Sequence, residues 1–418
     1  MRLRVMRIGR LHAATGAMLV LVAQPATAQP LTLQQALEKA RASEPGLAGR
    51  NAQLRAARSA ADAADALPDP KLDLALQNVP VTRDEAFSLT RDFMTMRSVG
   101  VTQDIPNLAK RHARLGRAQA DIAAAQTAAA VTAKDVRTMT ALAWVDLYFA
   151  ERRLAILDLL DRSIDDIAGT VAARVTSGSA RPSQGLEPKQ LKANVADRRD
   201  ELAVEIARAK AELGRWTGDP DPSATGAPPE WTIDPDRLVA QIDGLPELQA
   251  LDAATAQADA DVRLARAEKR PDFSVSLSYG NREPSFSDMV SVGVSIGLPL
   301  FAKHRQDPII AARAEQANAA RLARAGAERE LRAKLLGDLA EHRAHHERYK
   351  RAKDVLVPLA VERAKLDQAS YAAGRVDLGT ALGMTVAVAD AEIDELDREA
   401  MVVRDGIRIN LTYGNTPQ

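Results

Sequence analysis

The chain has 418 residues, and 56 Lys and Arg balance 56 Asp and Glu, so its formal net charge is zero. This balance offers no basic surface for nucleic acid. The absence of cysteine excludes disulfides, thiol catalysis, cysteine-ligated metal centres and lipid attachment through an N-terminal cysteine. Aromatic residues are only 3% of the chain, so we expect small residues between closely packed helices instead of a core of large rings.

Residues 1–28 have the pattern of a secretory signal peptide. Four arginines precede the apolar stretch from Ala13 to Ala23, and Ala26-Thr27-Ala28 matches the A-x-A cleavage pattern. The stretch is too short to span a bilayer, which takes about 20 residues as a helix. We therefore expect an exported protein that begins at Gln29 after cleavage, with a net charge of 52 − 56 = −4. No other stretch is long and apolar enough to predict a helical membrane anchor.

The remaining sequence contains two copies of one pattern. Residues 99–106 (VGVTQDIP) are matched by residues 292–299 (VGVSIGLP), and Gly178 is matched by Gly374 at a similar offset. We expect a first repeat over residues 29–217, a Pro/Gly-rich joint over residues 218–235 and a second repeat over residues 236–418.

Each repeat is predicted to contain a helix, a β-hairpin, a long helix, a turn and a further helix. In the first repeat these are a helix over about 32–66, a hairpin over about 70–106, a helix over about 107–174, a turn over about 175–183 and a helix to about 216. The second repeat has its hairpin over about 272–299 and its turn over about 371–380. The long helix would extend roughly 100 Å, like the two shorter helices stacked end to end. Pro188 and Pro358 are expected to kink their helices.

The hairpin strands alternate apolar and small polar residues. In the second hairpin, for example, Val290, Val292 and Val294 alternate with serine and glycine. In an exported chain this pattern is typical of an outer-membrane β-barrel, with apolar side chains toward lipid and polar ones toward the lumen. Four strands cannot close a barrel, because the smallest membrane barrels have eight. Either the hairpins pack on protein, or several chains share one barrel, and their helices then form a tube.

From residue 29 to Gly414 the sequence resembles the TolC-like outer-membrane channel components of tripartite efflux systems. The likeness includes the opening segments 31–38 (LTLQQALE) and 44–47 (EPGL), the two strand-to-helix segments named above, and Tyr371-Ala-Ala-Gly374 at the second turn. Residues 288–296 (DMVSVGVSI), 298–301 (LPLF) and 305–308 (RQDP) are especially similar to the heavy-metal, CzcC/CusC-like branch.

The resemblance implies a mainly α fold with β, in which tandem-duplicated α-helical hairpins form a periplasmic α-barrel and the two β-hairpins give four strands to a shared, trimeric 12-stranded barrel. It implies a homotrimer in the outer membrane of a Gram-negative bacterium, in contact with membrane lipid, a periplasmic adaptor (membrane fusion) protein and a proton-driven inner-membrane RND pump. The implied function is a passive duct for heavy-metal cations, with no catalysis, cofactor or nucleic acid. Many relatives carry an acylated cysteine, so anchoring must depend on the barrel here.

The second turn holds the candidates for a pore gate. Relatives often place an aspartate nine residues after the turn glycine, at the pore constriction, but that position is Gly383 in this sequence. Thr380 lies three residues before it, and Asp377 is the nearest carboxylate. Three copies of Asp377 could form a cation filter, or the side chain could only stabilise a helix N-terminus. Candidate adaptor contacts at the two turns are Gly178, Pro182, Gly374, Val376 and Leu378.

Two short segments resemble metal ligands, but other interpretations are favoured. His342, His345 and His346 would share one side of a helix, yet basic residues crowd them and no zinc-protease motif is present, so we expect a solvated helical face. Met94 and Met96 could bind a soft metal, but two lipid- or protein-facing residues at a strand end are preferred. No catalytic set of residues is recognisable, which predicts that the chain is not an enzyme.

Other functions remain compatible with the same sequence. The same fold could serve drug efflux or type I protein secretion, and neighbouring genes for a metal pump would separate these from metal export. An alternative of another class is a non-porous periplasmic coiled-coil scaffold. Such a scaffold would stay soluble without detergent, whereas a barrel protein would not.

Overall fold

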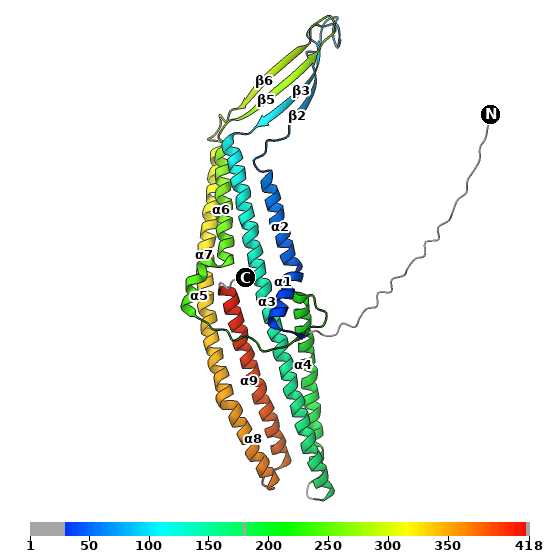
Figure 1. Cartoon of the computed structure of the whole chain (residues 1–418), viewed down its shortest axis with the longest axis vertical. Coiled ribbons are helices and arrows are strands. Elements are labelled where there is room, and N and C mark those ends of the chain that lie inside the picture. The colour runs from blue at the N-terminus through cyan, green and yellow to red at the C-terminus, as the bar shows by residue number, and fades with distance from the viewer. Residues whose placement is uncertain (1–29, 179–180, 415–418) are drawn as a thin grey trace, which may run out of the picture.

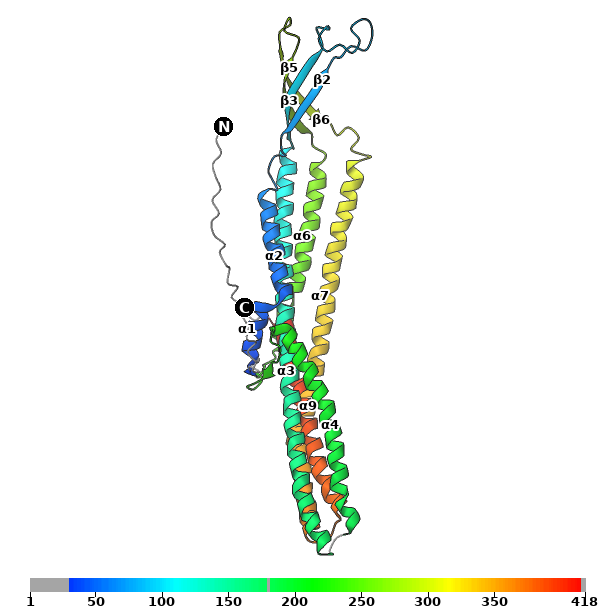
Figure 2. The ribbon, with the colours of Figure 1, turned by 90° about the vertical axis from the view of Figure 1, so that its right-hand side faces the viewer.

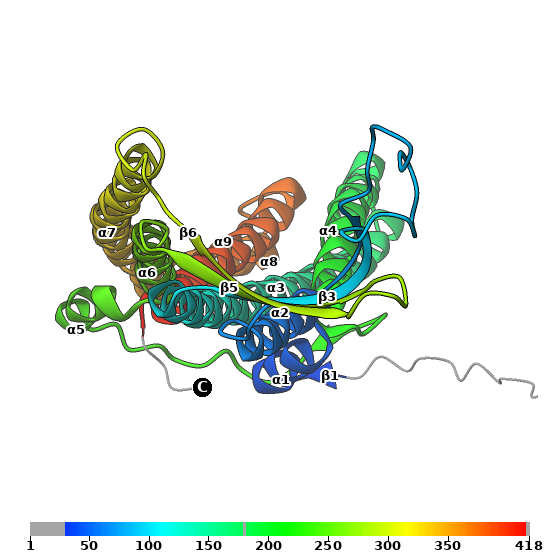
Figure 3. The ribbon, with the colours of Figure 1, turned by 90° about the horizontal axis from the view of Figure 1, so that it is seen from above.

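The computed structural model describes residues 30–178 and 181–414, and the predicted signal peptide lies outside them. The chain forms an elongated rod of helices with a four-stranded sheet at one end and two helical turns at the other (Figure 1). Helix α3 extends from the sheet to the far end of the rod (Figure 2). Seen from the sheet end, the helices form a curved layer with α7 near one edge and α4 near the other (Figure 3).

The first repeat begins with a short strand and two helices. Strand β1 (Pro30–Leu31) pairs in parallel with β4 (Ser223–Ala224) of the inter-repeat segment. Helices α1 (Leu33–Ser43) and α2 (Pro45–Asp62) replace the single helix predicted over about 32–66. The helix is interrupted because Pro45 has no N–H to donate and favours an extended conformation in the residue before it.

Two long helices complete the first repeat. Helix α3 (Leu108–Thr176) has 69 residues and is therefore roughly 100 Å long, as predicted. A 3-10 turn, η1 (Pro182–Gly185), precedes α4 (Glu187–Thr217). Pro188 lies in the first turn of α4, where its missing N–H would be unpaired in any case, so the kink predicted at Pro188 is wrong.

The second repeat has the same plan. Its helical elements are α5 (Pro235–Gln241), η2 (Ile242–Gly244), α6 (Pro246–Ala267), α7 (Gln306–Arg351), η3 (Ala352–Leu356), α8 (Val357–Ala372) and α9 (Leu378–Tyr413). Element η3 is one turn of π-helix directly before Pro358, so the α7–α8 rod is irregular where the proline predicted a kink. Among the helices of the described residues, none is both long and apolar enough to cross a membrane.

The four longer strands form one antiparallel sheet. They are β2 (Lys71–Gln77), β3 (Met96–Ile105), β5 (Asp272–Asn281) and β6 (Met289–Gly297). Their order is β2-β3-β5-β6, so β3 of the first repeat pairs with β5 of the second. The predicted hairpins are confirmed, and one sheet joins the two repeats.

The largest buried side chains gather at the middle of the rod. Trp144 is fully buried, and its Nε1–H donates to the carbonyl of Leu31 at 2.7 Å, which fastens β1 to α3. Phe149 of α3 and Ile407 of α9 belong to the same cluster, so both repeats contribute to it. Many other buried positions are alanine, as the low aromatic content predicts. This core fixes the positions of the sheet and the turns at the two ends.

Candidate functional site

The sheet has one apolar face and one face of small polar residues. Aligned apolar rows are Leu74, Val99, Tyr279 and Val290, and then Leu72, Val101, Leu277 and Val292. The rows between them consist mostly of glycine, serine and aspartate, as in Asp73, Gly100, Ser278 and Ser291. The apolar face lies open to solvent, since Leu74 is 73% exposed and Val292 is 72% exposed. The hairpins therefore do not bury their apolar face against the described part of their own chain.

Both edges of the sheet are unpaired. Within the described residues, β2 and β6 each hydrogen-bond to one neighbouring strand only. In a lipid environment each unsatisfied N–H or C=O group would cost several kcal/mol. The sheet thus has the surface of a membrane barrel wall but needs further strands on both sides.

A hydrogen-bonded clamp joins the sheet to the helices. The Asp272 carboxylate accepts hydrogen bonds from the Asn107 N–H at 2.9 Å, from Asn107 Nδ2 at 2.8 Å and from Lys110 Nζ at 2.6 Å. Lys110 also pairs with Glu268 at 3.2 Å. Burial alone would lower the pKa of Lys110, but its hydrogen bonds to Asp272 and Glu268 outweigh burial and raise that pKa. Asn107 also caps α3, so one clamp holds the start of the long helix and the start of β5 together.

At the opposite end, Asp377 caps helix α9. Its Oδ1 accepts a hydrogen bond from the Thr380 N–H at 2.8 Å, and hydrogen bonds from the backbone and side chain of Thr380 lower the pKa of the fully exposed carboxyl. Asp377 therefore stabilises the N-terminus of α9. Its carboxylate also remains exposed to solvent, which a cation filter would require. Gly383 is also exposed and lies one turn beyond Thr380 on α9.

The turn residues differ in their accessibility. Gly178 and Gly374 have φ of 77° and 70°, a left-handed conformation that explains glycine at both turns. Both glycines and Pro182 are exposed, and Val376 is half-buried. Leu378 is only 1% exposed and packs with Val171 and Leu382, so its side chain supports the turn and does not present a contact surface.

A second carboxylate at this end was not among the residues expected from the sequence. A Cβ added to Gly379 would lie 3.5 Å from Glu187 Oε2 and 3.7 Å from Asp377 Oδ1, so the two carboxylates flank this glycine. Glu187 Oε2 has no hydrogen-bond partner within the described residues although it is buried. Both acidic side chains start a helix, α4 or α9. Glu187 and Asp377 occupy corresponding positions in the two repeats, at the start of the helix that follows each turn. This correspondence could have revealed Glu187 from the sequence.

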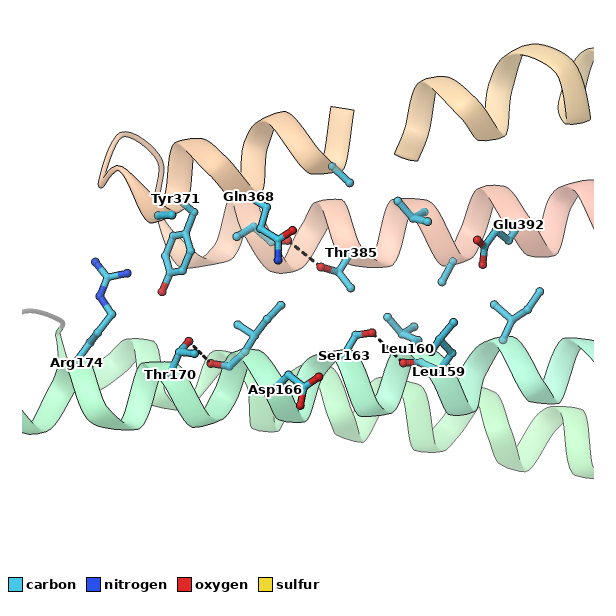
Figure 4. Close-up of a pocket in the computed structure, with 17 residues that line it drawn as sticks. Leu159, Leu160, Ser163, Asp166, Thr170, Arg174, Gln368, Tyr371, Thr385 and Glu392 are labelled. Atoms are coloured by element: carbon cyan, nitrogen blue, oxygen red, sulfur yellow. Dashed lines mark hydrogen bonds between the residues drawn. The ribbon is translucent and has the colours of Figure 1, made fainter. Parts of the chain in front are cut away.

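Above the turns, a groove of about 640 Å³ separates the two helical hairpins. It is lined by α3, α8 and α9, and Gln368 and Thr385 face α3 across it (Figure 4). At its turn end the guanidinium of Arg174 lies over the ring of Tyr371 at 4.9 Å and so bridges α3 and α8. At its other end lies Glu392, and burial and the nearby Glu395 raise the pKa of Glu392.

The prediction of a solvated helical face is wrong for His342 and His345 and correct for His346. His345 Nδ1 lies 2.7 Å from Oδ2 of the buried Asp405 of α9. His342 is partly buried and burial lowers its pKa, and only His346 is exposed. Arg408 of α9 pairs with Asp405 of the same helix at 3.3 Å and with Asp338 of α7 at 3.2 Å, which completes a polar contact between α7 and α9. No group of three or more possible His, Cys, Asp or Glu metal ligands occurs in residues 30–178 and 181–414.

The two methionines lie near the far end of the sheet. Met96 begins β3, and its sulfur covers Gly280, where an added Cβ would approach within 2.7 Å. Met94 precedes the strand and is 47% exposed. Packing against a glycine explains Met96 without a metal, in agreement with the preferred interpretation.

Comparisons with known proteins agree with this geometry. Residues 242–415 match the family model described as outer membrane efflux protein. The chain is 24% identical over 302 residues to the cobalt-zinc-cadmium resistance protein CzcC of Cupriavidus metallidurans, with 70% of this chain and 68% of that protein covered. A membrane protein from Pseudomonas aeruginosa has the same fold, with a TM-score of 0.78, 17% identity, and coverage of 91% of this chain and 92% of the other. The CusC structure aligns with a TM-score of 0.75 at 15% identity and covers 92% of each chain.

A one-sided membrane sheet on a long helical rod is the architecture of an outer-membrane efflux channel. Residues 242–415 thus match the outer membrane efflux protein family, and the chain as a whole has the fold of solved outer-membrane channels.

Proposed function

We propose that this channel is the outer-membrane duct of an RND-type tripartite system and that it passes heavy-metal cations to the exterior. The observation that carries the proposal is the sheet, with an exposed apolar face, a small polar face and two unpaired edges. Such a sheet is stable in lipid only as part of a closed barrel. The duct has no catalytic role in this proposal.

Three copies of the chain would close the barrel. The unpaired edge of β6 in one copy would pair with that of β2 in the next, which gives twelve strands and removes every edge. The curved helical layer (Figure 3) would close in the same way into a tube, with α4 and α7 near the contacts between copies. The inner face of this barrel would be lined by serine and glycine, which suits a water-filled passage.

Cation transport is supported by the carboxylates along the rod. Asp377 and Glu187 lie at the turn end, and Glu392 lies at the groove. In a trimer each would occur three times around one axis, and rings of carboxylates favour cations. The similarity to CzcC, whose name refers to cobalt, zinc and cadmium resistance, favours metal over drug or protein cargo.

The turns and the groove are the proposed contacts for a periplasmic adaptor. Gly178, Pro182 and Gly374 are exposed at the tip, and the groove between the hairpins could receive a helix from another protein. Val376 would contribute less because it is half-buried. A proton-driven pump would then supply the cargo through the adaptor.

Single-channel conductance of the detergent-purified protein, with its mass measured in parallel, tests the proposal. We expect a trimeric mass and discrete conductance steps in a planar bilayer. In a cobalt chloride gradient, the reversal potential should shift toward the equilibrium potential of the cation. In the same gradient, a double Glu187→Gln, Asp377→Asn variant should move the reversal potential toward zero. A water-soluble species without conductance would refute the duct and favour the scaffold. A conducting trimer without cation preference would refute the metal assignment alone.

A further inference from the structure

Three exposed cations lie at the rim where the sheet meets the helices. They are Arg270, Lys303 and Arg305, which we call the rim cations. Next to them Lys269 pairs with Asp307 at 2.7 Å, although the two residues are 38 positions apart. This ion pair places the α6–β5 connection beside the β6–α7 connection. The rim cations from both connections therefore lie at one level of the molecule.

Three acidic residues beside these two connections are already paired with other cations. Asp307 is bound to Lys269, while Asp272 and Glu268 are both bound to Lys110. Within the described residues no ion pair involves any rim cation. The rim therefore carries a positive charge that its own chain does not neutralise.

Exposed apolar side chains separate Lys303 and Arg305 from the sheet along the chain, whereas Arg270 lies two residues before β5. Leu298 is 63% exposed, Leu300 is 75% exposed and Phe301 is 69% exposed. They follow directly on β6, whose apolar face ends with Ile296 at 50% exposure. Along the β6–α7 connection the order is thus lipid-type strand, apolar wedge and cations. This is the order of acyl chains and headgroups at a bilayer surface.

We propose that the rim binds the phosphate groups of anionic phospholipids in the periplasmic leaflet of the outer membrane, with Leu298, Leu300 and Phe301 (the apolar wedge) inserted among the acyl chains. Long cationic side chains reach headgroups while their stems remain in apolar surroundings. This inference rests on the proposed function, because the sheet must lie in the membrane for the rim to meet lipid. It commits to lipid instead of free phosphate because the apolar wedge adjoins the charges.

The test compares lipid binding by the full-length trimer and by two matched variants. Phosphatidylglycerol and phosphatidylcholine are titrated into the detergent-solubilised protein, and bound lipid is counted by native mass spectrometry. A basic residue near an anionic lipid surface changes binding by about fivefold. The variant Arg270→Gln, Lys303→Gln, Arg305→Gln should therefore lose most of its preference for phosphatidylglycerol, on the order of a hundredfold in total.

The control removes three exposed cations far from the rim. Arg343→Gln, Lys350→Gln, Arg351→Gln lies on α7 roughly 55 Å below the first turn of that helix and should retain the preference. High salt should weaken binding in the wild type, because the Debye length falls to about 3 Å at 1 M.

Four results would overturn the inference. The rim variant could bind phosphatidylglycerol as well as the wild type, or glycerol phosphate could compete as strongly as the lipid, which would indicate a free-phosphate site. Loss of trimer mass in Phe301→Ser would show that a second copy covers the apolar wedge. Conductance on the same preparation separates the two proposals: a conducting trimer without lipid preference overturns this inference alone, whereas failure to insert overturns the duct.

Discussion

Replacing Asp272 by alanine should loosen the junction between the sheet and the rod. Its carboxylate accepts three hydrogen bonds, two from Asn107 and one from Lys110, and the Lys110 side chain is only 9% exposed. The substitution leaves a nearly buried ammonium with Glu268 as its remaining partner, at 3.2 Å. It also leaves the Asn107 N–H without its acceptor. Both losses act on the folded state only.

The expected cost is about 2–4 kcal/mol of unfolding free energy. A hydrogen bond to a charged group contributes about 1.5–3 kcal/mol, and removal of one partner of a buried ion pair costs about 3–5 kcal/mol. The expected cost lies below the full value for a buried ion pair for two reasons. The Asp272 side chain is 40% exposed, and Glu268 still balances the charge of Lys110. Asn107 Nδ2 also keeps two backbone carbonyls as acceptors.

Thermal and denaturant unfolding of the detergent-solubilised protein, followed by helical circular dichroism, measures this cost. The control is Asp104→Ala, which removes the exposed Lys71–Asp104 ion pair at the same end of the rod and should cost below about 1 kcal/mol. The double variant Lys110→Met, Asp272→Asn should be clearly more stable than the sum of its two single variants predicts. Equal costs for Asp272→Ala and Asp104→Ala, or additivity in the double variant, would refute the clamp.

Three further predictions concern the helical end. Asp377→Asn keeps a good helix cap but removes the charge, so cation selectivity should fall with little loss of stability; wild-type reversal potentials would show that Asp377 only caps the helix. Tyr371→Leu removes the ring beneath Arg174, a contact of about 0.5–1 kcal/mol, and should raise the open probability of single channels by about two- to fivefold; an unchanged value would remove this contact from gating. Burial raises the pKa of Glu392 and Glu399, so the folded state binds their protons more tightly than the unfolded state does. The resulting contribution to the free energy of unfolding is present at low pH and is lost as pH rises through the raised pKa values. The double glutamine variant should therefore melt about 2 °C higher than wild type at pH 7.5 but not at pH 4, and equal shifts at both pH values would contradict this.

Much of the fold could be predicted because its signals are local. The proline-free stretch after Asn107 and the alternation around Val292 each specify their element without help from distant residues. The exceptions are also local in cause. Pro45 splits the first helix, and Pro188 falls in a first turn where proline is tolerated. A more careful placement of helix starts would have avoided the second error.

The contacts at the sites depend on which positions meet between distant segments. The pairing of Lys269 with Asp307 and of Asn107 with Asp272 joins residues that no short motif relates. Leu378 illustrates the same difficulty, because its burial depends on Val171 of the other hairpin. The residues next to a position in the sequence predict its exposure poorly in such a rod, because other helices cover more than one side of each helix.

The helical hairpins nevertheless contain a simple rule that the sequence could have supplied. In an antiparallel helix pair, contacting residues lie at equal distances from the turn. The midpoint between His345 and Asp405 is position 375, next to the turn glycine Gly374. The pair Asp158 and Arg199 in the first hairpin likewise has its midpoint between 178 and 179, at Gly178. Reflection of His345 about Gly374 leads to position 403, two residues before Asp405, so the spacing in the sequence already indicates that His345 faces α9 within one turn of this aspartate.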